Sequence, residues 1–301
     1  MLGYGTTSFT VGMGTYLRNA LYPIVIAKFL SSAAVTLFSI PAKMLSVPLN
    51  GVGSMTEFVN PLSSQMEARQ DKKGLRDLLI LSTEAACLVY VPLAVIMIVF
   101  GKQMIGLWVG NAYSTTYSLL VLLTIGMGVS STQSATQSML FGIGRHKPLV
   151  AIRFAEGLGT AAVGILFIHF WGLWGYAFAS LILPLIMNLI VLPRYACSIV
   201  GLSFATYLAK GWLKASAYSV PLAFGLLVFE RFWPVKSWTL LVAGCLLGCI
   251  TYLLTLTLSS LFGHKLNARW SKLETLAVLE KKYLRTHALR DTTLNVDSWL
   301  E

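Results

Sequence analysis

The sequence has 301 residues, of which 56% are hydrophobic and only 12% are charged, and its mean hydropathy is +0.71. Soluble domains carry about 25% charged residues, so this composition excludes an ordinary soluble protein and indicates one embedded in a membrane. The net charge of +11 is interpreted as a signal of membrane orientation, and no nucleic-acid partner is expected.

Eight stretches are apolar and long enough to cross a bilayer, which takes about 20 residues. We therefore predict an all-α fold, a polytopic membrane helical bundle of about eight transmembrane helices. Pro23, Pro41 and Pro48 fall in the first two spans, where proline is tolerated if neighbouring helices or water satisfy the freed carbonyl groups. The predicted spans are residues 5–28, 33–57, 77–100, 115–142, 149–169, 171–193, 212–230 and 237–262.

The order of these spans predicts three parts of the chain. Residues 1–193 hold six spans with short connections, and residues 194–262 hold a basic connector and two accessory transmembrane helices. Residues 263–301 form a charged tail in which apolar side chains recur at roughly helical spacing among lysines and arginines. We interpret the tail as a basic amphipathic helix on the cytoplasmic membrane surface, with a merely solvated helix as the alternative.

Lysine and arginine favour the cytoplasmic side of a membrane. With eight spans, 17 of the 23 cations fall on one side and 4 on the other, while Arg18 and Lys43 lie within spans. We therefore expect both termini in the cytoplasm and anionic lipid head groups beside the inward cations. The opening “MLGYGTTSFTVGMG” lacks the basic start of a signal peptide, so we expect the chain to begin with a membrane helix.

The stretch “TLFSIPAKMLSVPLN” (residues 36–50) places Lys43 at the centre of an apolar span. A charge at mid-bilayer costs roughly 2.5–3.5 kcal/mol and usually faces a bundle interior or a water-filled cavity. At 1.5 Å per residue, Lys43 lies about 21 Å from the inner end of its span and Arg18 about 20 Å from the inner end of the first. The two cations therefore share one layer of the membrane.

Two like charges at one depth are explained if water or an anion lies between them. An arginine offers phosphate a bidentate fork, and a lysine offers it a point charge. The alternatives are that Lys43 and Arg18 snorkel to the interface or pair with an acid, and Glu84 is the only acid expected deep in a span.

Polar side chains form stripes on two spans, one of which includes Gln133 and Gln137, and the other Arg18 and Asn19. So many polar groups cannot face lipid cheaply, which favours a hydrophilic cavity. Hydrogen bonding between helices is the competing explanation. The fourth-span stripe is Ser130, Gln133, Ser134, Gln137 and Ser138, and the first-span stripe is Ser8, Thr15, Arg18 and Asn19.

No pattern typical of an enzyme is present. The four cysteines and four histidines form no metal, redox or catalytic set, so we predict a protein that is not an enzyme and has no cofactor. The cysteines are interpreted as small buried hydrophobes.

Four segments, in this order, carry a resemblance to a known family. They are “VTLFSIPAKMLSVPLNGVGSM” (35–55), the stretch from “ARQDKKGLRD” through “FGKQMIGLWVG” (68–110), “GIGRHKP” (142–148) and “WGLWGYAFASLI” (171–182). Over roughly residues 1–200 the chain resembles the C-terminal part of bacterial polysaccharide flippases of the multidrug/oligosaccharide-lipid/polysaccharide exporter superfamily. The family's second helix of this lobe has a tyrosine where Phe38 stands here.

The resemblance implies that residues 1–193 are a six-helix C-terminal lobe and that the protein is a multi-pass protein of the bacterial inner membrane. The implied function is flipping of an undecaprenyl-pyrophosphate-linked oligosaccharide for lipopolysaccharide or capsule biosynthesis, with Lys43 and Arg18 holding the diphosphate. Asn19, Gln133 and Gln137 are the other predicted substrate-binding residues. The family's first lobe is absent from this sequence, which leaves open a truncated gene product or a separately encoded N-terminal lobe as partner.

Three other functions are alternatives. A drug/cation antiporter of the same superfamily should carry buried carboxylates, whereas the deep charges here are mainly cationic. A lipid II flippase is a close alternative. A membrane-integral glycan ligase would need acids or a large outer loop, and neither is visible in the sequence.

The cation asymmetry predicts the side of the membrane on which each loop lies. A phosphatase that is active only outside the cytoplasm should be active when fused after Phe170 and inactive when fused after Arg290. A reporter that fluoresces only in the cytoplasm should give the opposite pattern. Phosphatase activity after Arg290 with none after Phe170 would disprove the predicted topology.

Overall fold

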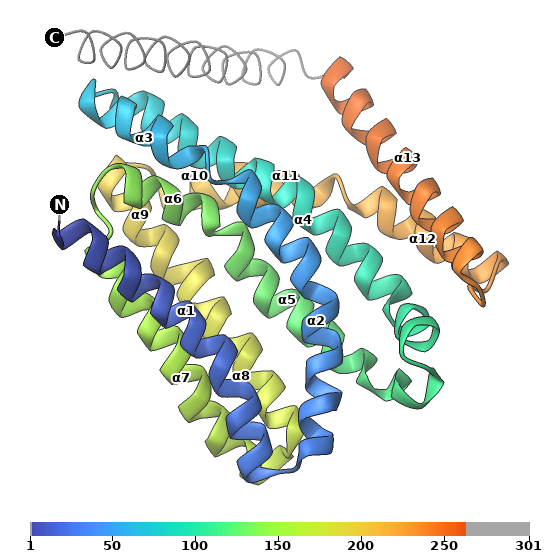
Figure 1. Ribbon diagram of the computed structural model, residues 1–301. Helices are drawn as coiled ribbons and strands as arrows, with labels where there is room; N and C mark the ends of the chain where they lie inside the picture. The colour runs from blue at the N-terminus through green and yellow to red at the C-terminus, as the bar shows by residue number, and fades with distance from the viewer. Residues whose placement is uncertain (1, 263–301) are drawn as a thin grey trace, which may run out of the picture. The chain divides into compact units, whose positions relative to one another are not determined.

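A computed structural model describes residues 2–262, which fold into helices joined by short turns (Figure 1). The predicted all-α membrane bundle is confirmed. The N-terminal helices are α1 (Leu2–Phe29), α2 (Ser32–Met55), α3 (Val59–Ala68), α4 (Lys72–Trp108), η1 (Asn111–Thr116), α5 (Tyr117–Thr132) and α6 (Ser134–Gly142). They are followed by α7 (Lys147–Trp171), α8 (Leu173–Leu185), η2 (Ile186–Val191), α9 (Leu192–Val200), α10 (Phe204–Tyr207), η3 (Leu208–Leu213), α11 (Lys214–Ala217), α12 (Val220–Phe232) and α13 (Trp238–Phe262).

Seven helical segments within residues 2–262 are long and apolar enough to cross a membrane, and they correspond to the second through eighth predicted spans. The first predicted span falls on α1, whose described apolar stretch is Ala20–Phe29. The predicted tail helix (263–301) lies outside the described residues. Contacts divide the chain into Met1–Tyr252 and Leu253–Glu301, and the three predicted parts remain predictions.

The helix α4 is longer than the span predicted for it. Its 37 residues correspond to about 55 Å at 1.5 Å per residue, against about 30 Å of hydrocarbon core. It continues from the predicted end at residue 100 to Trp108. The Nε2 amide of Gln103, in this extension, donates a hydrogen bond to Glu230 on α12, so the polar end of α4 has a partner that is distant in sequence.

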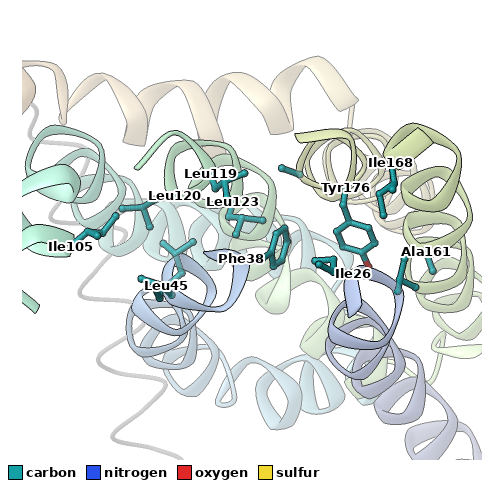
Figure 2. Packing of buried hydrophobic residues seen from close by; sticks show 13 residues of the cluster. Ile26, Phe38, Leu45, Ile105, Leu119, Leu120, Leu123, Ala161, Ile168 and Tyr176 are labelled. Atoms are coloured by element: carbon teal, nitrogen blue, oxygen red, sulfur yellow. The ribbon is translucent and has the colours of Figure 1, made fainter. Parts of the chain in front are cut away.

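The core of the bundle lies where α1, α2, α4, α5, α7 and α8 meet (Figure 2). Phe38 of α2 packs edge-on against Tyr176 of α8, with ring centroids 5.5 Å apart. Leu45 lies about two turns further along the same face of α2 and is fully buried in the same cluster. Because one side of α2 is fixed in this way, its opposite side is presented outward.

The two accessory helices pack on α4. The rings of Phe100 on α4 and Phe229 on α12 lie 6.3 Å apart, and Gly244 of α13 lies against both. The Tyr252 hydroxyl donates to the Leu88 carbonyl over 2.7 Å. Residues 238–252 of α13 and all of α12 therefore attach to the bundle through α4.

Helices α7 and α8 approach so closely that glycine is required at their contact. A Cβ on Gly175 would lie 2.2 Å from the Phe167 carbonyl oxygen, whereas a Cβ on Gly159, at the same interface, would make ordinary contact with Leu183 at 3.4 Å. A backbone atom cannot move aside as the end of a side chain can.

We expect Gly175→Ala to destabilise the bundle by about 1–3 kcal/mol, as overpacking does, and Gly159→Ala to be neutral or slightly stabilising. Thermal unfolding in detergent, followed by size-exclusion fluorescence, measures both variants. Equal stability of the two would show that the α7–α8 contact is looser than described.

Candidate functional site

Lys43 lies halfway along α2 (Ser32–Met55) with its side chain exposed. The neighbouring Pro41 and Leu45 are buried, so the helix turns its apolar side to the core and Lys43 away from it. Among the described side chains Lys43 forms no ion pair. It is a cation on an exposed helix face, near the middle of a helix that belongs to a segment long and apolar enough to cross a membrane.

The exposed face of α2 around Lys43 is mostly polar. At 100° per residue, its exposed polar side chains fall within a sector of about 80°, and the exposed Val47 lies just beside that sector. We call these positions the α2 polar stripe: Thr36, Lys43, Ser46, Asn50 and Ser54. No comparable stripe is expected on a helix face that lipid covers.

The outer faces of other helices are different. On α7, α8 and α12 the exposed side chains include large apolar residues in succession along each helix, as a lipid-facing surface requires. Those residues include Leu158, Leu166 and Phe170 on α7, Phe178 and Ile182 on α8, and Phe224, Leu227 and Phe232 on α12. Since lipid would meet apolar side chains there and an ammonium group on α2, the α2 polar stripe is the exceptional part of this surface.

Gln133, a predicted substrate-binding residue, is completely buried. Its Nε2 donates to the Tyr207 hydroxyl over 3.0 Å, and its Oε1 accepts from the Thr136 hydroxyl over 2.8 Å. The Tyr207 hydroxyl also lies 3.2 Å from the hydroxyl of Thr83 on α4. These bonds join α4, α6 and α10, and they give Gln133 an interhelical role.

The other polar residues of the fourth span also bond to neighbouring helices or to their own helix. Ser134 pairs with Thr56 between α6 and the end of α2, with the hydroxyls 2.7 Å apart. Gln137 is partly buried and donates to the Gln133 carbonyl over 3.3 Å. Ser130, whose hydroxyl donates to Glu156 on α7, Gln133 and Ser134 thus form hydrogen bonds between helices. The sequence had left open whether this polar stripe lines a cavity or bonds to neighbouring helices, and for these three residues the structure shows the bonds.

The side chains of Arg18 and Asn19 lie outside the part of the chain that the structure describes. Their backbone belongs to α1, which packs beside α2. Arg18, Asn19, Lys43, Gln133 and Gln137 therefore remain predicted substrate-binding residues, of which the structure places Lys43 on an open face and Gln133 in the interior.

Glu84 is buried, as its position in the third span suggested, and it is paired. Its Oε1 lies 2.7 Å from the Lys214 Nζ at the start of α11, and Lys214 is 35% exposed. The connector is thus fastened to α4 by an ion pair, and also by Arg76, whose Nε donates to the Val200 carbonyl over 2.6 Å.

The expectation that Glu84 is the only deep acid is wrong, because Glu156 of α7 is also buried, with 1% of its surface exposed. Arg153, one of the 17 cations assigned to the cytoplasmic side, lies one turn earlier on α7 and donates to the Glu156 carboxylate over 2.5 Å. The i, i+3 spacing of an arginine and a glutamate on one helix was visible in the sequence and could have revealed this pair.

The Arg153–Glu156 pair is extended by neutral groups from two further elements. The Ser130 hydroxyl on α5 donates to Glu156 over 3.1 Å, and the Asn188 Nδ2 in the π-helix η2 donates to Ser130 over 3.1 Å. We call Arg153, Glu156, Ser130 and Asn188 the buried polar cluster. It joins α5, α7 and η2.

An internal cavity of about 30 Å³ lies between α1, α2, α5, α7 and α8. Because a water molecule needs about 10–15 Å³ by this measure, the cavity has room for one or two waters and for no larger ligand. Within residues 2–262 no group of three or more His, Cys, Asp and Glu side chains could hold a metal ion. The α2 polar stripe is therefore the better candidate for a large ligand. The cavity is lined by Tyr22, Phe38, Leu123, Met127, Thr160, Tyr176, Ser180 and Pro184.

Comparison with known proteins agrees with the sequence and the fold. Residues 1–118 match a family model described as “Polysaccharide biosynthesis protein”. The solved structure titled “Lipid II flippase MurJ, inward closed conformation” matches with a TM-score of 0.65 and 17% identity, covering 87% of this chain and 53% of that one. No curated protein matches the sequence. The chain thus spans about half the length of the solved flippase.

These matches confirm the resemblance to flippases for polysaccharide or lipid-linked substrates that was predicted from the sequence. The TM-score of 0.65 shows that this chain has the fold of about half of the solved structure. At 17% identity the match shows the fold alone, and the substrate is argued from the site.

The buried polar cluster leads to a test of stability. Arg153→Met would leave the Glu156 carboxylate buried without its cation, which should cost about 3–5 kcal/mol, while replacing both charges together is often nearly neutral. We expect Arg153→Met to lower the thermal unfolding midpoint markedly and the double variant Arg153→Met/Glu156→Gln to recover most of the loss. A double variant as unstable as the sum of its single changes would show that the two charges do not act as a pair.

Proposed function

We propose that this chain is part of a membrane transporter that moves an undecaprenyl-pyrophosphate-linked oligosaccharide across the bacterial inner membrane for lipopolysaccharide or capsule biosynthesis. The observation that carries the proposal is Lys43, an exposed cation at the middle of a transmembrane helix, set among polar side chains. An ammonium group at that depth is costly in lipid and is stabilised by water and a diphosphate.

The diphosphate is the part of the substrate that Lys43 would bind. Arg18 is at a similar depth on the neighbouring helix α1 by sequence, and its guanidinium would add a bidentate contact to phosphate oxygens. The hydroxyl and amide groups of Ser46 and Asn50 would offer hydrogen bonds along the same face. Moving a large polar head group past this face requires space filled by water, which the small internal cavity does not supply.

We infer that a second lobe supplies the other wall of that space. The solved flippase is about twice as long as the part that this chain matches, and the α2 polar stripe is open in the described bundle. A separate N-terminal lobe facing α2 would enclose a polar path between the two lobes. Both termini of this chain would lie in the cytoplasm, as the distribution of cations favours.

Flipping of a lipid-linked substrate is supported over drug/cation antiport by the pairing of the buried acids. A drug/cation antiporter needs a carboxylate free to bind its coupling ion, whereas Glu84 and Glu156 each have a basic partner within the chain. The name of the solved structure favours lipid II as a second candidate substrate, and its diphosphate would use the same cations. A membrane-integral glycan ligase would need acids or a large outer loop near the interface, and neither is visible in the sequence.

The test uses variants in the host's own gene, with export of surface polymer as the readout. Lys43→Glu should reduce export at least about tenfold, because a like charge beside the diphosphate costs several kcal/mol. Lys43→Arg should retain activity. Lys102→Glu, a charge reversal at the exposed outer end of α4, is the matched control and should behave as wild type.

Immunoblotting of membranes checks that each variant inserts. The lipid-linked precursor that accumulates in Lys43→Glu cells identifies the substrate as an oligosaccharide unit or as lipid II. Full export by a Lys43→Leu/Arg18→Leu double variant would show that the diphosphate binds elsewhere.

A further inference from the structure

We propose that α3 and α6 form one hinged unit, which we call the α3–α6 pair, and that it tilts relative to the rest of the bundle about two adjacent helix breaks. One break separates α2 from α3 at residues 56–58, and the other separates α5 from α6 at Gln133. The hinge itself is a property of the described residues. Its use as a gate for the α2 polar stripe rests on the proposed function.

The two breaks lie side by side. The hydroxyls of Thr56, in the first break, and Ser134, directly after the second, are 2.7 Å apart. Just before the breaks, the Ser131 hydroxyl donates to the Leu49 carbonyl over 3.2 Å. Two neighbouring helices thus lose their regular path at one level, so both can bend about a common axis.

The backbone at the α2–α3 break has the geometry of a hinge. Thr56 and Val59 donate to the carbonyls of Gly53 and Thr56, three residues back, in place of the fourth. Such 3₁₀ bonding within a long helical run often marks a functional hinge. Gly51 and Gly53 precede the break, and a Cβ on either would meet nothing within 4 Å. Packing does not require these glycines, and their effect is to make the backbone easier to bend.

Beyond the breaks, α3 and α6 are held to each other. The Ser63 hydroxyl donates to the Met139 carbonyl over 3.3 Å, and a Cβ on Gly142 would overlap Ser63 at 1.9 Å. Val59 and Leu62 of α3 are buried. Contact as close as this at Gly142 means that one helix cannot move without the other.

The described hydrogen bonds between the α3–α6 pair and the rest of the bundle lie at the two ends of the pair, while both helices also pack beside α4. The hydrogen bonds of Gln133 and Thr136 to Tyr207 lie at the second break itself, where movement is smallest. At the far end, the Tyr195 hydroxyl donates to the Arg145 carbonyl over 3.2 Å in an exposed position, where water can replace it. Because Ser54, the last member of the α2 polar stripe, directly precedes the hinge, tilting would open or close that end of the stripe.

Distances between spin labels test the hinge in the full chain, reconstituted in lipid nanodiscs with the four native cysteines replaced by serine or alanine. The pair Glu67→Cys/Ala155→Cys reports on α3 against α7, and Glu67→Cys/Arg145→Cys reports on α3 against the turn that directly follows α6. All three positions are exposed. We expect at least two distance populations for the first pair and one narrow population for the second.

A second variant probes the cause of the motion. Gly51→Ala/Gly53→Ala stiffens α2 without a clash and should narrow the Glu67–Ala155 distribution to one population, whereas Gly159→Ala, on α7, should leave it unchanged. One narrow Glu67–Ala155 population in the otherwise unchanged chain, or a distribution that the double alanine change does not narrow, would overturn the proposal. This readout involves no transport, so a failure of the hinge is distinct from a failure of the proposed function.

Discussion

The hydrocarbon interior of a membrane offers no water to a polar group, and this constraint organises the bundle more than apolar packing does. Glu84 is bound by Lys214, Glu156 by Arg153, and Gln133 by Tyr207. Two of these three bonds join residues more than 70 positions apart in sequence. In lipid, apolar side chains discriminate little between one neighbouring helix and another, so such pairs help to decide which helices lie together.

The same constraint accounts for irregular helices where they occur. The π-helix η2 follows Pro184, and Asn188 within it donates to the Pro184 carbonyl over 3.2 Å and to Ser130 over 3.1 Å. The π-helix is rare and is found frequently at functional sites. Here its Asn188 is fully buried and belongs to the buried polar cluster, so the irregular backbone and the buried charge are parts of one arrangement.

The sequence predicted the spans well because the length of an apolar stretch is a local property. Which helices pack against one another depends on contacts between residues distant in sequence, and the predictions that were wrong or left open concern such contacts. In the continuation of α4 to Trp108, Gln103 donates a hydrogen bond to Glu230, a contact that no local pattern reveals. The polar stripe that contains Gln133 was equally compatible with a cavity and with helix contacts, since the deciding partner, Tyr207, lies 74 residues away. The ion pair of Arg153 and Glu156 could have been predicted from their spacing. It was missed because Arg153 was counted only as a cation of the cytoplasmic side.

Two cations within helices, Arg153 and Lys43, differ in their burial and in whether an acid neutralises them. Arg153 is 6% exposed and neutralised by Glu156, whereas Lys43 is exposed and has no acidic partner among the described side chains. Not every polar group beside Lys43 argues for water. The hydroxyls of Thr36 and Ser46 donate to carbonyls of their own helix, so lipid could cover them.

Two groups on α2 therefore favour an aqueous face, the Lys43 ammonium group and the Asn50 side-chain amide. Among the described contacts, neither group forms a hydrogen bond within α2. An amide without a hydrogen bond in an apolar medium costs roughly 2–7 kcal/mol, and the ammonium adds its own cost. Together these costs are comparable to the whole stability of a typical domain, about 5–15 kcal/mol. Lipid would close over an aqueous face unless protein stood opposite it, and this is the physical reason for placing a second lobe against α2.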